Sequence, residues 1–482
     1  MNLESQSVLV IGLGASGRAA ARLALARGAI VTICDTRPRD QFDDGFADLE
    51  TAGITVLCGC DTIPAGHFDL AVLSPGLFLE SGLCRSVVAA GLKLLGELEF
   101  GWRLAARPTV AVTGTNGKTT TTELIAHMLA SAGRPAEAGG NIGRPVSDIA
   151  LHSPGTDQLV LEVSSFQLET ASRFGPEVAV LLNLTPDHLD RHASMVDYAG
   201  AKARMLAGQS ASGLAVVQTE ALAYLRSLHV EIPARLVTFS AISRRADLHF
   251  DDGLIVGSLP DWQGPLLAMQ QTALRGAHNA ENVMAALAVG RELGLSLEDM
   301  VRAIKSYRPA AHRCEVVGER DGVVFVNDSK ATNLDAMIKA IGATPAVLPD
   351  EPNILLIAGG TGKGQEFHEA GPLLAKRVKA AFLIGESSSA MREAWNLFTT
   401  CHLVDDLEEA VRFAVELGES GDVVLLSPAC ASFDQFTGYA QRGDVFKAIV
   451  AGLSATTYSA SLWSNPTRDS GASESSSREH QP

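Results

Sequence analysis

Short apolar runs recur along the chain, and each run is followed by glycine or a small polar residue. In the first part of the chain the runs are SVLVIG (7–12), AIVTICD (29–35), FDLAVLSPG (68–76) and GLKLLGELEF (91–100). Uninterrupted apolar runs of this length are typical of parallel strands that are buried on both faces. The alanine- and arginine-rich stretch between the first two runs is typical of a helix, so the pattern predicts a βαβ unit. It also predicts that the last two runs contain the ends of further strands, and that a first domain covers residues 1–97.

The next part of the chain repeats the strand signal and then changes to a helical one. The strand-like runs are PTVAVTG (108–114), QLVLEV (158–163) and VAVLLN (178–183). ALRGAHNAENVMAALAVGRELG (273–294) predicts an amphipathic helix, and an asparagine near its start is a typical N-cap. The proline in SYRPAAHRCEVV (306–317) breaks the helical run, which predicts that a second domain covers residues 98–310.

Strand-like and helical stretches alternate again after residue 310. The runs are GVVFVND (322–328), NILLIAGG (353–360), AAFLIG (380–385) and GDVVLLSP (421–428). We therefore expect an α/β protein with three domains: an N-terminal Rossmann-like domain, a central domain like those of P-loop ATPases, and a C-terminal Rossmann-like domain. The third domain is predicted to cover residues 311–455. The segment 456–482 is rich in serine, threonine and charge, and is predicted to be disordered.

Composition excludes some classes of protein and leaves the prediction of three α/β domains unchanged. The 482 residues carry a formal net charge of −16, which argues against broad binding to nucleic acid or to anionic membranes. No uncharged apolar stretch reaches the roughly 18 residues of a membrane span, and the N-terminus lacks the pattern of a signal peptide. The seven cysteines are scattered. We expect reduced thiols, mostly buried, in a cytoplasmic protein.

The first predicted strand leads into a complete G-x-G-x-x-G pattern, formed by Gly12, Gly14 and Gly17. Between a strand and a helix, this pattern is typical of a loop whose backbone N–H groups bind a pyrophosphate. Asp35 ends the next strand, where an acid that binds ribose is expected. NAD is the usual ligand of such a loop, but a uridine diphosphate group carries the same pyrophosphate. A glycine turn that serves only tight packing is the alternative without a ligand.

A second glycine loop, TGTNGKTT (113–120), lies between an apolar strand and a predicted helix. The common P-loop would place its first glycine at position 112, which is valine, so this loop is shorter. Gly114 and Gly117 allow backbone N–H groups to turn inward. Lys118 can reach the β- and γ-phosphates, and the hydroxyl of Thr119 or Thr120 can bind Mg²⁺. A helix start rich in lysine and threonine would explain neither glycine, so the loop predicts nucleotide binding.

Glu162 ends the apolar run QLVLE, at the edge of the sheet where ligands of parallel sheets bind. Beside a phosphate loop it is the natural second ligand of Mg²⁺, although a capping or salt-bridged glutamate would look the same. His188, in TPDHLDRH, belongs to a cluster whose spacing is not that of usual zinc sites. For Lys202, spacing alone predicts a surface position. Asn279 and Asn282 are three residues apart and are expected to share one helix face.

Three polar loops follow apolar strands in the predicted third domain. Asp328 and Lys330 lie in VNDSKATN (326–333), Lys363 lies in GGTGKGQEF (359–367), and Ser432 lies in SPACASFDQF (427–436). Each loop alone is a weak signal. Because loops after parallel strands meet at one edge of a sheet, together they predict a site for a small charged substrate that faces the ATP.

With these residues assembled, the chain over residues 5–453 resembles the Mur ligases, which form amide bonds with ATP in peptidoglycan precursor synthesis. TGTNGKTT is similar to the phosphate loop of that family, which also occurs in folylpolyglutamate synthases. Other stretches resemble the branch that adds D-glutamate to UDP-N-acetylmuramoyl-L-alanine, and the Asp-Asn-Pro-Arg box of the diaminopimelate- or lysine-adding branch is not seen. These stretches are DTR (35–37), SPG (74–76), ELEF (97–100), GGNIG (139–143), VNDSKATN, GGTGKG and SPACASFDQF.

The resemblance implies a role for each matching residue, with Lys118, His188 and Lys202 as the catalytic ones. The uridine nucleotide would contact Ala15, Ser16, Asp35, Thr36, Arg37 and Gly76, and Asn141 would lie beside the substrate. ATP would contact Gly114, Thr115, Asn116, Gly117, Lys118, Thr119, Thr120, Asn282, Arg313 and Asp328. Two Mg²⁺ ions would be held by Thr119, Glu162, His188 and Lys202, the lysine as a carbamate. D-glutamate would contact Thr332, Lys363, Ser432 and Tyr439, a tyrosine where related sequences often have phenylalanine.

The residues leave three other functions open. An NAD-dependent oxidoreductase would explain Gly12–Gly17 but not TGTNGKTT. A nucleotide-binding regulator without catalysis would leave Glu162, Lys363 and Ser432 without a role. A sister ligase that adds another amino acid would share most of the motifs. The expected enzyme is a monomer with small-molecule substrates, without nucleic acid or a membrane as partner.

Overall fold

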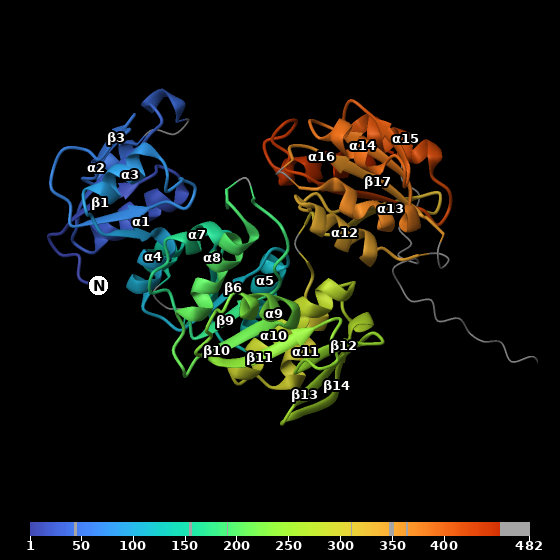
Figure 1. Ribbon diagram of the computed structural model, residues 1–482, viewed down its shortest axis with the longest axis horizontal. Helices are drawn as coiled ribbons and strands as arrows, with labels where there is room; N and C mark the ends of the chain where they lie inside the picture. The colour runs from blue at the N-terminus through green and yellow to red at the C-terminus, as the bar shows by residue number, and fades with distance from the viewer. Residues whose placement is uncertain are drawn as a thin grey trace, which may run out of the picture.

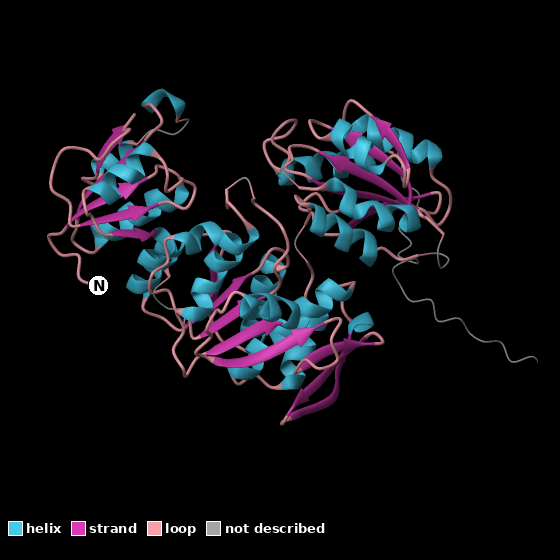
Figure 2. Cartoon of the chain, in the orientation of Figure 1, coloured by secondary structure: helices cyan, strands magenta, loops and turns pink. Residues whose placement is uncertain are grey.

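The computed structural model describes residues 1–42, 46–153, 157–189, 191–309, 311–346, 351–362 and 365–453. Three separate β-sheets, each packed against helices, divide this part of the chain (Figure 1, Figure 2). Lys363 and the segment 456–482 lie outside the described residues. Among the described helices, none combines the length and the apolar character that a membrane crossing requires.

The first sheet has the strand order β3-β2-β1-β4-β5, and all its strands are parallel. Its strands are β1 (Ser7–Ile11), β2 (Ile30–Asp35), β3 (Thr55–Cys58), β4 (Leu70–Leu73) and β5 (Leu94–Gly96). Its helical segments are α1 (Ala15–Ala26), η1 (Arg39–Gln41), α2 (Ala47–Thr51) and α3 (Gly82–Ala89). The strands expected at 7–12, 29–35 and 68–76 are confirmed, and the parallel order is that of a Rossmann half.

The run at 91–100 contains the end of a strand, as expected, and also the start of a helix. β5 ends at Gly96, and Glu97 begins α4 (Glu97–Ala105). The apolar residues Phe100 and Leu104 of this helix pack into the same core as Val8 and Val10. A strand and the start of a helix therefore share one apolar run, which hydrophobic periodicity does not separate over so few residues.

The central sheet has nine strands in the order β14-β13-β12-β11-β10-β9-β6-β8-β7. Its strands are β6 (Thr109–Thr113), β7 (Ala136–Gly140), β8 (Gln158–Glu162), β9 (Val178–Leu181), β10 (Leu214–Gln218), β11 (Arg235–Ser240), β12 (Leu248–Asp251), β13 (Leu254–Leu259) and β14 (Trp262–Ala268). All neighbours are parallel except the antiparallel pairs that β13 makes with β12 and β14. Its helical segments are α5 (Lys118–Ser131), α6 (Val146–His152), α7 (Ser165–Glu169), α8 (Met195–Ala207), α9 (Thr219–Ser227), η2 (Met269–Gln271), α10 (Ala277–Glu292) and α11 (Leu297–Ser306).

Helix α10 corrects two details of the prediction for residues 273–294. Residues 280–290 are all buried, so the helix has no solvent-facing stripe, because α5, α11 and the strands β10–β12 pack around it. Its N-cap is Gly276, which makes no side-chain cap. Asn279 lies inside the first turn and donates to the carbonyl oxygen of Arg275 at 2.7 Å. The helix is therefore part of the core of the central domain.

The third sheet has the order β15-β16-β20-β17-β18-β19, with only the edge strand β15 antiparallel. Its strands are β15 (Glu315–Arg320), β16 (Val323–Asn327), β17 (Ile354–Gly359), β18 (Val378–Ile384), β19 (Thr400–Leu403) and β20 (Val423–Ala429). Its helical segments are α12 (Leu334–Ala343), η3 (Phe367–Ala370), α13 (Gly371–Arg377), α14 (Ser388–Trp395), α15 (Leu407–Leu417) and α16 (Tyr439–Gly452). Since β16, β20 and β17 are neighbours, the three polar loops that follow them start at one edge of the sheet.

All seven cysteines lie within the described residues, and none of them forms a disulfide there, as expected. Three are buried, namely Cys34, Cys84 and Cys430, whereas the other four are half-buried. The expectation that most of them are buried is therefore wrong. Burial raises the pKa of Cys34 to about 12, so this thiol stays protonated at neutral pH.

Candidate active site

The phosphate loop joins the end of β6 to the start of α5, between two neighbouring strands of the central sheet. Gly114 and Gly117 have φ angles of 152° and 85°, which side chains disfavour. A Cβ atom at Gly117 would lie 2.2 Å from Oδ1 of Asn282 on α10. Asn282 in turn donates to Oδ1 of Asn279 at 3.0 Å, so the two asparagines share one helix face, as predicted. The glycines are therefore required by the shape of the loop and by its contact with α10.

Asn183, just after β9, fixes the direction of the loop's backbone N–H groups. Its Oδ1 accepts from the N–H of Thr115 at 3.0 Å and from that of Asn116 at 2.8 Å. Lys118 lies over the same loop and donates to the carbonyl oxygens of Gly114 and Thr115 at 2.9 and 2.7 Å. The loop thus carries a held backbone and a lysine ammonium group at the N-terminus of a helix, the arrangement that binds phosphate.

Thr119, Glu162 and Asn141 are brought together at the ends of β8 and β7. The buried carboxylate of Glu162 accepts from Thr119 Oγ1 at 2.6 Å and from Asn141 Nδ2 at 2.9 Å. A hydroxyl and a carboxylate are oxygen ligands of the kind that Mg²⁺ prefers, and Mg²⁺ usually keeps several waters and phosphate oxygens. The oxygen atoms of Thr119 and Glu162 therefore fit Mg²⁺ bound together with a nucleotide. Among the described residues, no three His, Cys, Asp or Glu side chains form a metal-binding group.

His188 follows β9 in a left-handed conformation, with φ 56°. Its Nε2 lies 3.6 Å from Oδ2 of Asp187, and its ring meets the edge of Phe166 at 4.8 Å between centroids. The structure therefore places His188 beside an acid and an aromatic ring. Asn141, expected beside the substrate, donates to the carboxylate of Glu162 at 2.9 Å.

Lys202, on α8, is buried beneath the phosphate loop with 1% of its surface exposed, so the surface position expected from spacing is wrong. Its ammonium group donates to the carbonyl oxygen of Gly114 at 2.8 Å. Burial, followed by the positive charge of Lys118, lowers the pKa of Lys202 well below its usual value, although Asp187 and Glu162 oppose the shift. Helical periodicity missed this residue because a lysine on the inner face of a helix has the spacing of an apolar one.

A cavity opens between the phosphate loop and the third domain. Its lining includes Asn282, Arg313, Asp328 and Lys330, and also His278, which the sequence did not single out. Asp328 accepts from the N–H of Cys314 and from the hydroxyl of Ser427, and burial raises the pKa of Asp328 to about 6. The Nε atom of Arg313 is buried without a hydrogen-bond partner. An unpaired guanidinium donor at this wall suits an acceptor atom of a nucleotide.

Arg442 holds the three loops of the third sheet together. This arginine of α16 is 1% exposed and donates to the carbonyl oxygens of Ser329, Cys430 and Gly359 at 2.8, 3.1 and 3.4 Å. The carbonyls of Ser329 and Cys430 belong to the segments that follow β16 and β20, and Gly359 is the last residue of β17. The edge predicted for a small charged substrate is therefore a single rigid unit. The sequence did not reveal Arg442, because its partners are backbone atoms far away in the chain.

The described residues that are expected to bind D-glutamate lie along this edge of the third sheet. The N–H of Thr332 donates to the carbonyl oxygen of Lys330 at 2.9 Å, and Ser432 is 2% exposed. The ammonium group of Lys330 lies 5.1 Å from the centre of the exposed Tyr439 ring. Burial and then Arg313 lower the pKa of Lys330 to about 8. The same ammonium group donates to Thr119 Oγ1 at 3.3 Å, so it connects this edge to the phosphate loop.

The first glycine loop forms a separate site in the first domain. A Cβ atom at Gly17 would lie 1.8 Å from the carbonyl oxygen of Gly12, so close packing of α1 on β1 requires glycine there. Gly14 has open space around it. Asp35 is buried, and its carboxylate accepts from the N–H of Leu13 at 2.9 Å and from Nε of Arg37 at 3.2 Å. Burial would raise the pKa of Asp35, but these hydrogen bonds lower it below its usual value.

The other residues expected around this loop lie at its rim. Ala15 is exposed and Ser16 half-buried at the start of α1, and Thr36 is half-buried beside Asp35. Gly76 is exposed in the segment after β4. This segment lies against the glycine loop, since a Cβ atom at Gly12 would be 2.8 Å from Cβ of Ser74. The structure therefore brings these residues together around the first glycine loop.

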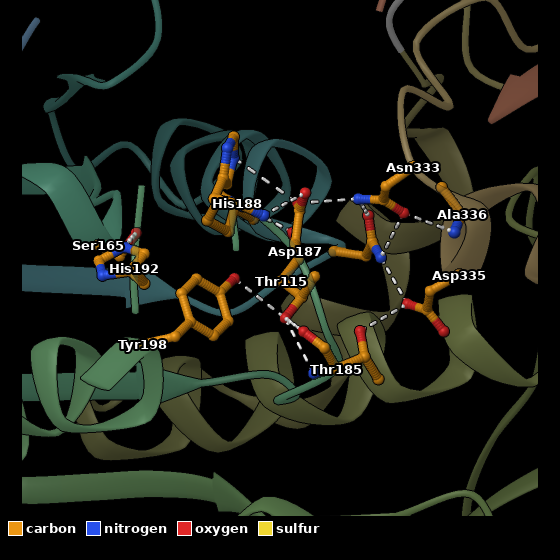
Figure 3. A network of polar contacts seen from close by, with 12 residues as sticks. Thr115, Ser165, Thr185, Asp187, His188, His192, Tyr198, Asn333, Asp335 and Ala336 are labelled. Carbon is orange, nitrogen blue, oxygen red and sulfur yellow. Dashed lines mark hydrogen bonds and ion pairs between the residues drawn. The ribbon is translucent and has the colours of Figure 1, made fainter. Parts of the chain in front are cut away.

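A network of polar contacts joins the central domain to the start of α12. Figure 3 shows Asp187 and Thr185 facing Asn333 and Asp335. Asn333 donates to Oδ2 of Asp187 at 3.0 Å, and Thr185 donates to Oδ2 of Asp335 at 3.1 Å. Asn116 of the phosphate loop also donates to Asp335. The third domain is thus held over the loop by side chains, none of which the sequence singled out except Asn116.

Comparison with known proteins agrees with the division of the chain into three domains. Three family models match: "Mur ligase MurD-like, N-terminal domain" over residues 6–96, "Mur ligase middle domain" over 112–290, and "Mur ligase, glutamate ligase domain" over 312–430. A UDP-N-acetylmuramoylalanine--D-glutamate ligase from Pelotomaculum thermopropionicum is 41% identical over 456 residues, which cover 93% of this chain and 98% of that protein. The chain belongs to the Mur ligase family. A protein of the same name from Acidobacterium capsulatum is 40% identical over 454 residues, covering 93% of this Mur ligase and 97% of the relative.

Solved structures share the fold of this Mur ligase at low identity. A pseudomurein peptide ligase type C from Methanothermus fervidus aligns with a TM-score of 0.57 at 19% identity, covering 92% of this chain and 100% of that one. The UDP-N-acetylmuramate-alanine ligase MurC from Thermotoga maritima aligns with a TM-score of 0.57 at 16% identity, covering 92% and 98%. The α/β architecture with three domains, predicted from the apolar runs and the glycine loops, is confirmed.

Proposed function

We propose that this Mur ligase joins D-glutamate to UDP-N-acetylmuramoyl-L-alanine with ATP, in cytoplasmic peptidoglycan precursor synthesis. Both curated relatives carry the name of this reaction over nearly the whole chain. Within the molecule, the observation that carries the proposal is the 3.3 Å contact between Lys330 and Thr119. It supports a single site in which a phosphate loop and an amino-acid site from two domains meet, as a ligase with an acyl-phosphate intermediate requires.

The proposal assigns one substrate to each domain. Residues 1–97 hold the uridine diphosphate group through Ala15, Ser16, Asp35, Thr36, Arg37 and Gly76. Residues 98–310 hold ATP on the phosphate loop, with Asn282, Arg313 and Asp328 around its nucleoside. Residues 311–455 hold D-glutamate through Thr332, Ser432 and Tyr439, together with Lys363, which lies outside the described residues. The enzyme acts as a monomer.

In the first step, the terminal carboxylate of the UDP substrate attacks the γ-phosphorus of ATP, and ADP leaves. Both reactants are anions, so the site must lower their repulsion. Lys118 lies on the loop, and Lys330 reaches it from the third domain. Thr119 and Glu162 are the residues that would hold Mg²⁺, which neutralises phosphate charge when bound.

Lys202 is proposed to carry a carbamate. Burial and the charge of Lys118 lower the pKa of Lys202, which favours the uncharged amine, and an uncharged amine adds to carbon dioxide with loss of one proton. Lys118, whose charge disfavours a Lys202 cation, favours the resulting anion in the same place. The carbamate and His188 are the groups that would hold a second Mg²⁺.

In the second step, the amine of D-glutamate attacks the acyl carbon, and the bond from that carbon to the phosphate oxygen breaks. A carboxylate at pH 7 is a poor electrophile, which is why it must first be phosphorylated. Lys363 pairs with a carboxylate of the amino acid and selects an acidic side chain. Arg442 keeps the loops that carry Ser432 and Thr332 at a fixed distance from each other.

The test is phosphate release from Mg²⁺-ATP with UDP-N-acetylmuramoyl-L-alanine and one amino acid at a time. We expect release with D-glutamate, and none with L-glutamate, lysine or diaminopimelate. Lys118→Ala should abolish release while its circular dichroism and unfolding midpoint stay unchanged. Release with another amino acid would reassign the third domain. A fluorescence titration with NADH that shows binding would instead favour the oxidoreductase.

A further inference from the structure

Arg191 connects the central domain to the segment of the first domain that carries Gly76. It lies in the loop between β9 and α8, which rises from the central domain between the two outer domains (Figure 1). Its guanidinium group donates to the carbonyl oxygens of Pro75 and Leu77 at 3.4 and 3.1 Å. Its Cζ atom also lies 4.8 Å from the centre of the Phe78 ring. Arg191 therefore contacts both neighbours of Gly76.

The same side chain is anchored inside the central domain. Nη2 and Nε donate to the two carboxylate oxygens of Glu169, at the end of α7, at 2.8 and 3.2 Å. The guanidinium plane lies 4.1 Å from the centre of the Phe166 ring, and only 8% of the side chain is exposed. Each nitrogen of the guanidinium group thus has an acceptor, two on the central side and two on the first domain. A rigid group bound on both sides transmits a displacement of either side.

Arg191 is also tied to His188. The N–H groups of Arg191 and His192 donate to the carbonyl oxygen of His188 at 3.1 and 2.9 Å. Phe166, on which Arg191 stacks, meets the His188 ring with its edge. The histidine has a positive φ, so its ring direction depends on the turn that these hydrogen bonds close. Backbone and ring contacts both lead from Arg191 to His188.

We propose that Arg191 is a positioning residue that couples binding of the uridine nucleotide beside Gly76 to the placement of His188 at the ATP site. The inference rests on the proposed function, because that function assigns Gly76 and His188 their ligands. Arginine suits this task because its planar fork can bind a carboxylate and two carbonyl oxygens at once while stacking on rings, which a lysine cannot do. Such coupling is reciprocal: each ligand raises the affinity for the other by the same factor.

The experiment measures this factor directly by calorimetry. Full-length enzyme is titrated with Mg²⁺ and a non-hydrolysable ATP analogue, with and without saturating UDP-N-acetylmuramoyl-L-alanine. In the unmodified enzyme we expect the nucleotide substrate to tighten binding of the analogue at least about fivefold. In Arg191→Gln and Arg191→Lys the factor should fall towards one, while the affinity for each ligand alone changes less than about threefold. Arg204→Gln is the matched control, since Arg204 contacts the carbonyl oxygen of Glu169 from α8.

Phe78→Ala gives a second test that leaves no buried charge unpaired, because Phe78 is 52% exposed. It removes the stacking partner on the first domain, and the coupling factor should fall in this variant as well. Unchanged coupling in folded Arg191 variants would overturn the proposal, and so would an unmodified enzyme without coupling. Phosphate release that depends on D-glutamate, measured on the same preparations, tests the proposed function separately. If phosphate release depends on D-glutamate but the Arg191 variants keep the coupling factor, only the role of Arg191 is rejected.

Discussion

The ammonium group of Lys202 lies 2.8 Å from the carbonyl oxygen of Gly114, beneath the glycine that opens the phosphate loop. The lysine and the loop therefore form one unit, although 88 positions of sequence separate them. Anything that alters the charge at Lys202 acts on the backbone that would hold the nucleotide phosphates. This relationship makes Lys202 the most direct point at which to test the proposed chemistry.

Lys202→Ala should lower phosphate release at least about a hundredfold, the scale of losing a group that stabilises charge in the transition state. If the lysine carries a carbamate, formate or acetate should partly restore activity, because a small carboxylate can occupy the vacated space. Lys305→Ala, an exposed lysine of α11, is the control and should keep full activity. Loss of activity without rescue would argue for a structural lysine, and full activity in the variant would remove Lys202 from the site.

The raised pKa of Asp328 predicts that its contribution to the stability of the folded protein falls as the pH rises. Its folded-state pKa is about 6, above the ordinary value of 3.8, so the folded protein holds this proton more tightly than the unfolded chain does. The stabilisation is fully present below pH 3.8 and is lost as the pH rises through about 6. The free energy of unfolding relative to Asp328→Asn should therefore fall by up to about 3 kcal/mol between pH 4 and pH 7. Urea unfolding of both proteins at the two pH values measures this, and an equal difference at both would contradict it.

Substitution of Asp335 tests whether its contacts hold the third domain against the central one. Its carboxylate accepts from Asn116 and Thr185 across the domain boundary, so Asp335→Ala removes contacts between the domains. We expect kcat/KM for D-glutamate to fall about tenfold, the effect of losing one or two hydrogen bonds of about 1 kcal/mol. X-ray scattering should show a larger radius of gyration. Asp321→Ala, an exposed change in the same domain, should alter neither quantity. If Asp335→Ala also alters neither, Asp335 does not hold the third domain over the phosphate loop.

Substitution of Arg442 is expected to raise KM for the amino acid and not KM for ATP. Arg442→Lys retains the charge but cannot span the carbonyl oxygens of Ser329, Cys430 and Gly359, because its donors sit on one nitrogen. We expect KM for D-glutamate to rise about tenfold, since one or two hydrogen bonds are lost, with KM for ATP within about twofold. Arg412→Lys on the exposed face of α15 is the matched control. An equal rise in both KM values would show that Arg442 supports the whole domain.

The apolar runs predicted most of the strands that carry the site, because strands buried on both faces have few polar residues to interrupt the pattern. β7 (Ala136–Gly140), whose end lies beside Asn141, was not predicted. β6, β8, β9, β16, β17 and β20 all lie where such runs were found. β13 and β14 were not predicted, since the hairpin at the edge of the central sheet alternates buried and exposed positions. The burial of α10 on all sides was also not predicted, because it depends on helices and strands that pack around it from elsewhere in the chain.

For the site, residues within a loop could be predicted and residues that act across the fold could not. Gly114, Gly117, Lys118 and Thr119 stand together in the sequence, and their chemistry follows from spacing. Asn183 holds the same loop from a distance of 67 and 68 positions, and nothing in the neighbourhood of Asn183 indicates a partner. Contacts of this kind arise only from strand order, which placed β9 beside β6.

The close approach of Gly117 to Asn282 also limits which residues this protein can accept at position 117 during evolution. A Cβ atom at position 117 would lie 2.2 Å from the Oδ1 atom of Asn282, and the φ angle of 85° at this position is disfavoured for any side chain. A smaller residue at position 282 would therefore relieve the contact but not the backbone strain. In a library that varies both positions, functional variants should keep glycine at position 117, whereas position 282 is limited by its place in the lining of the nucleotide cavity.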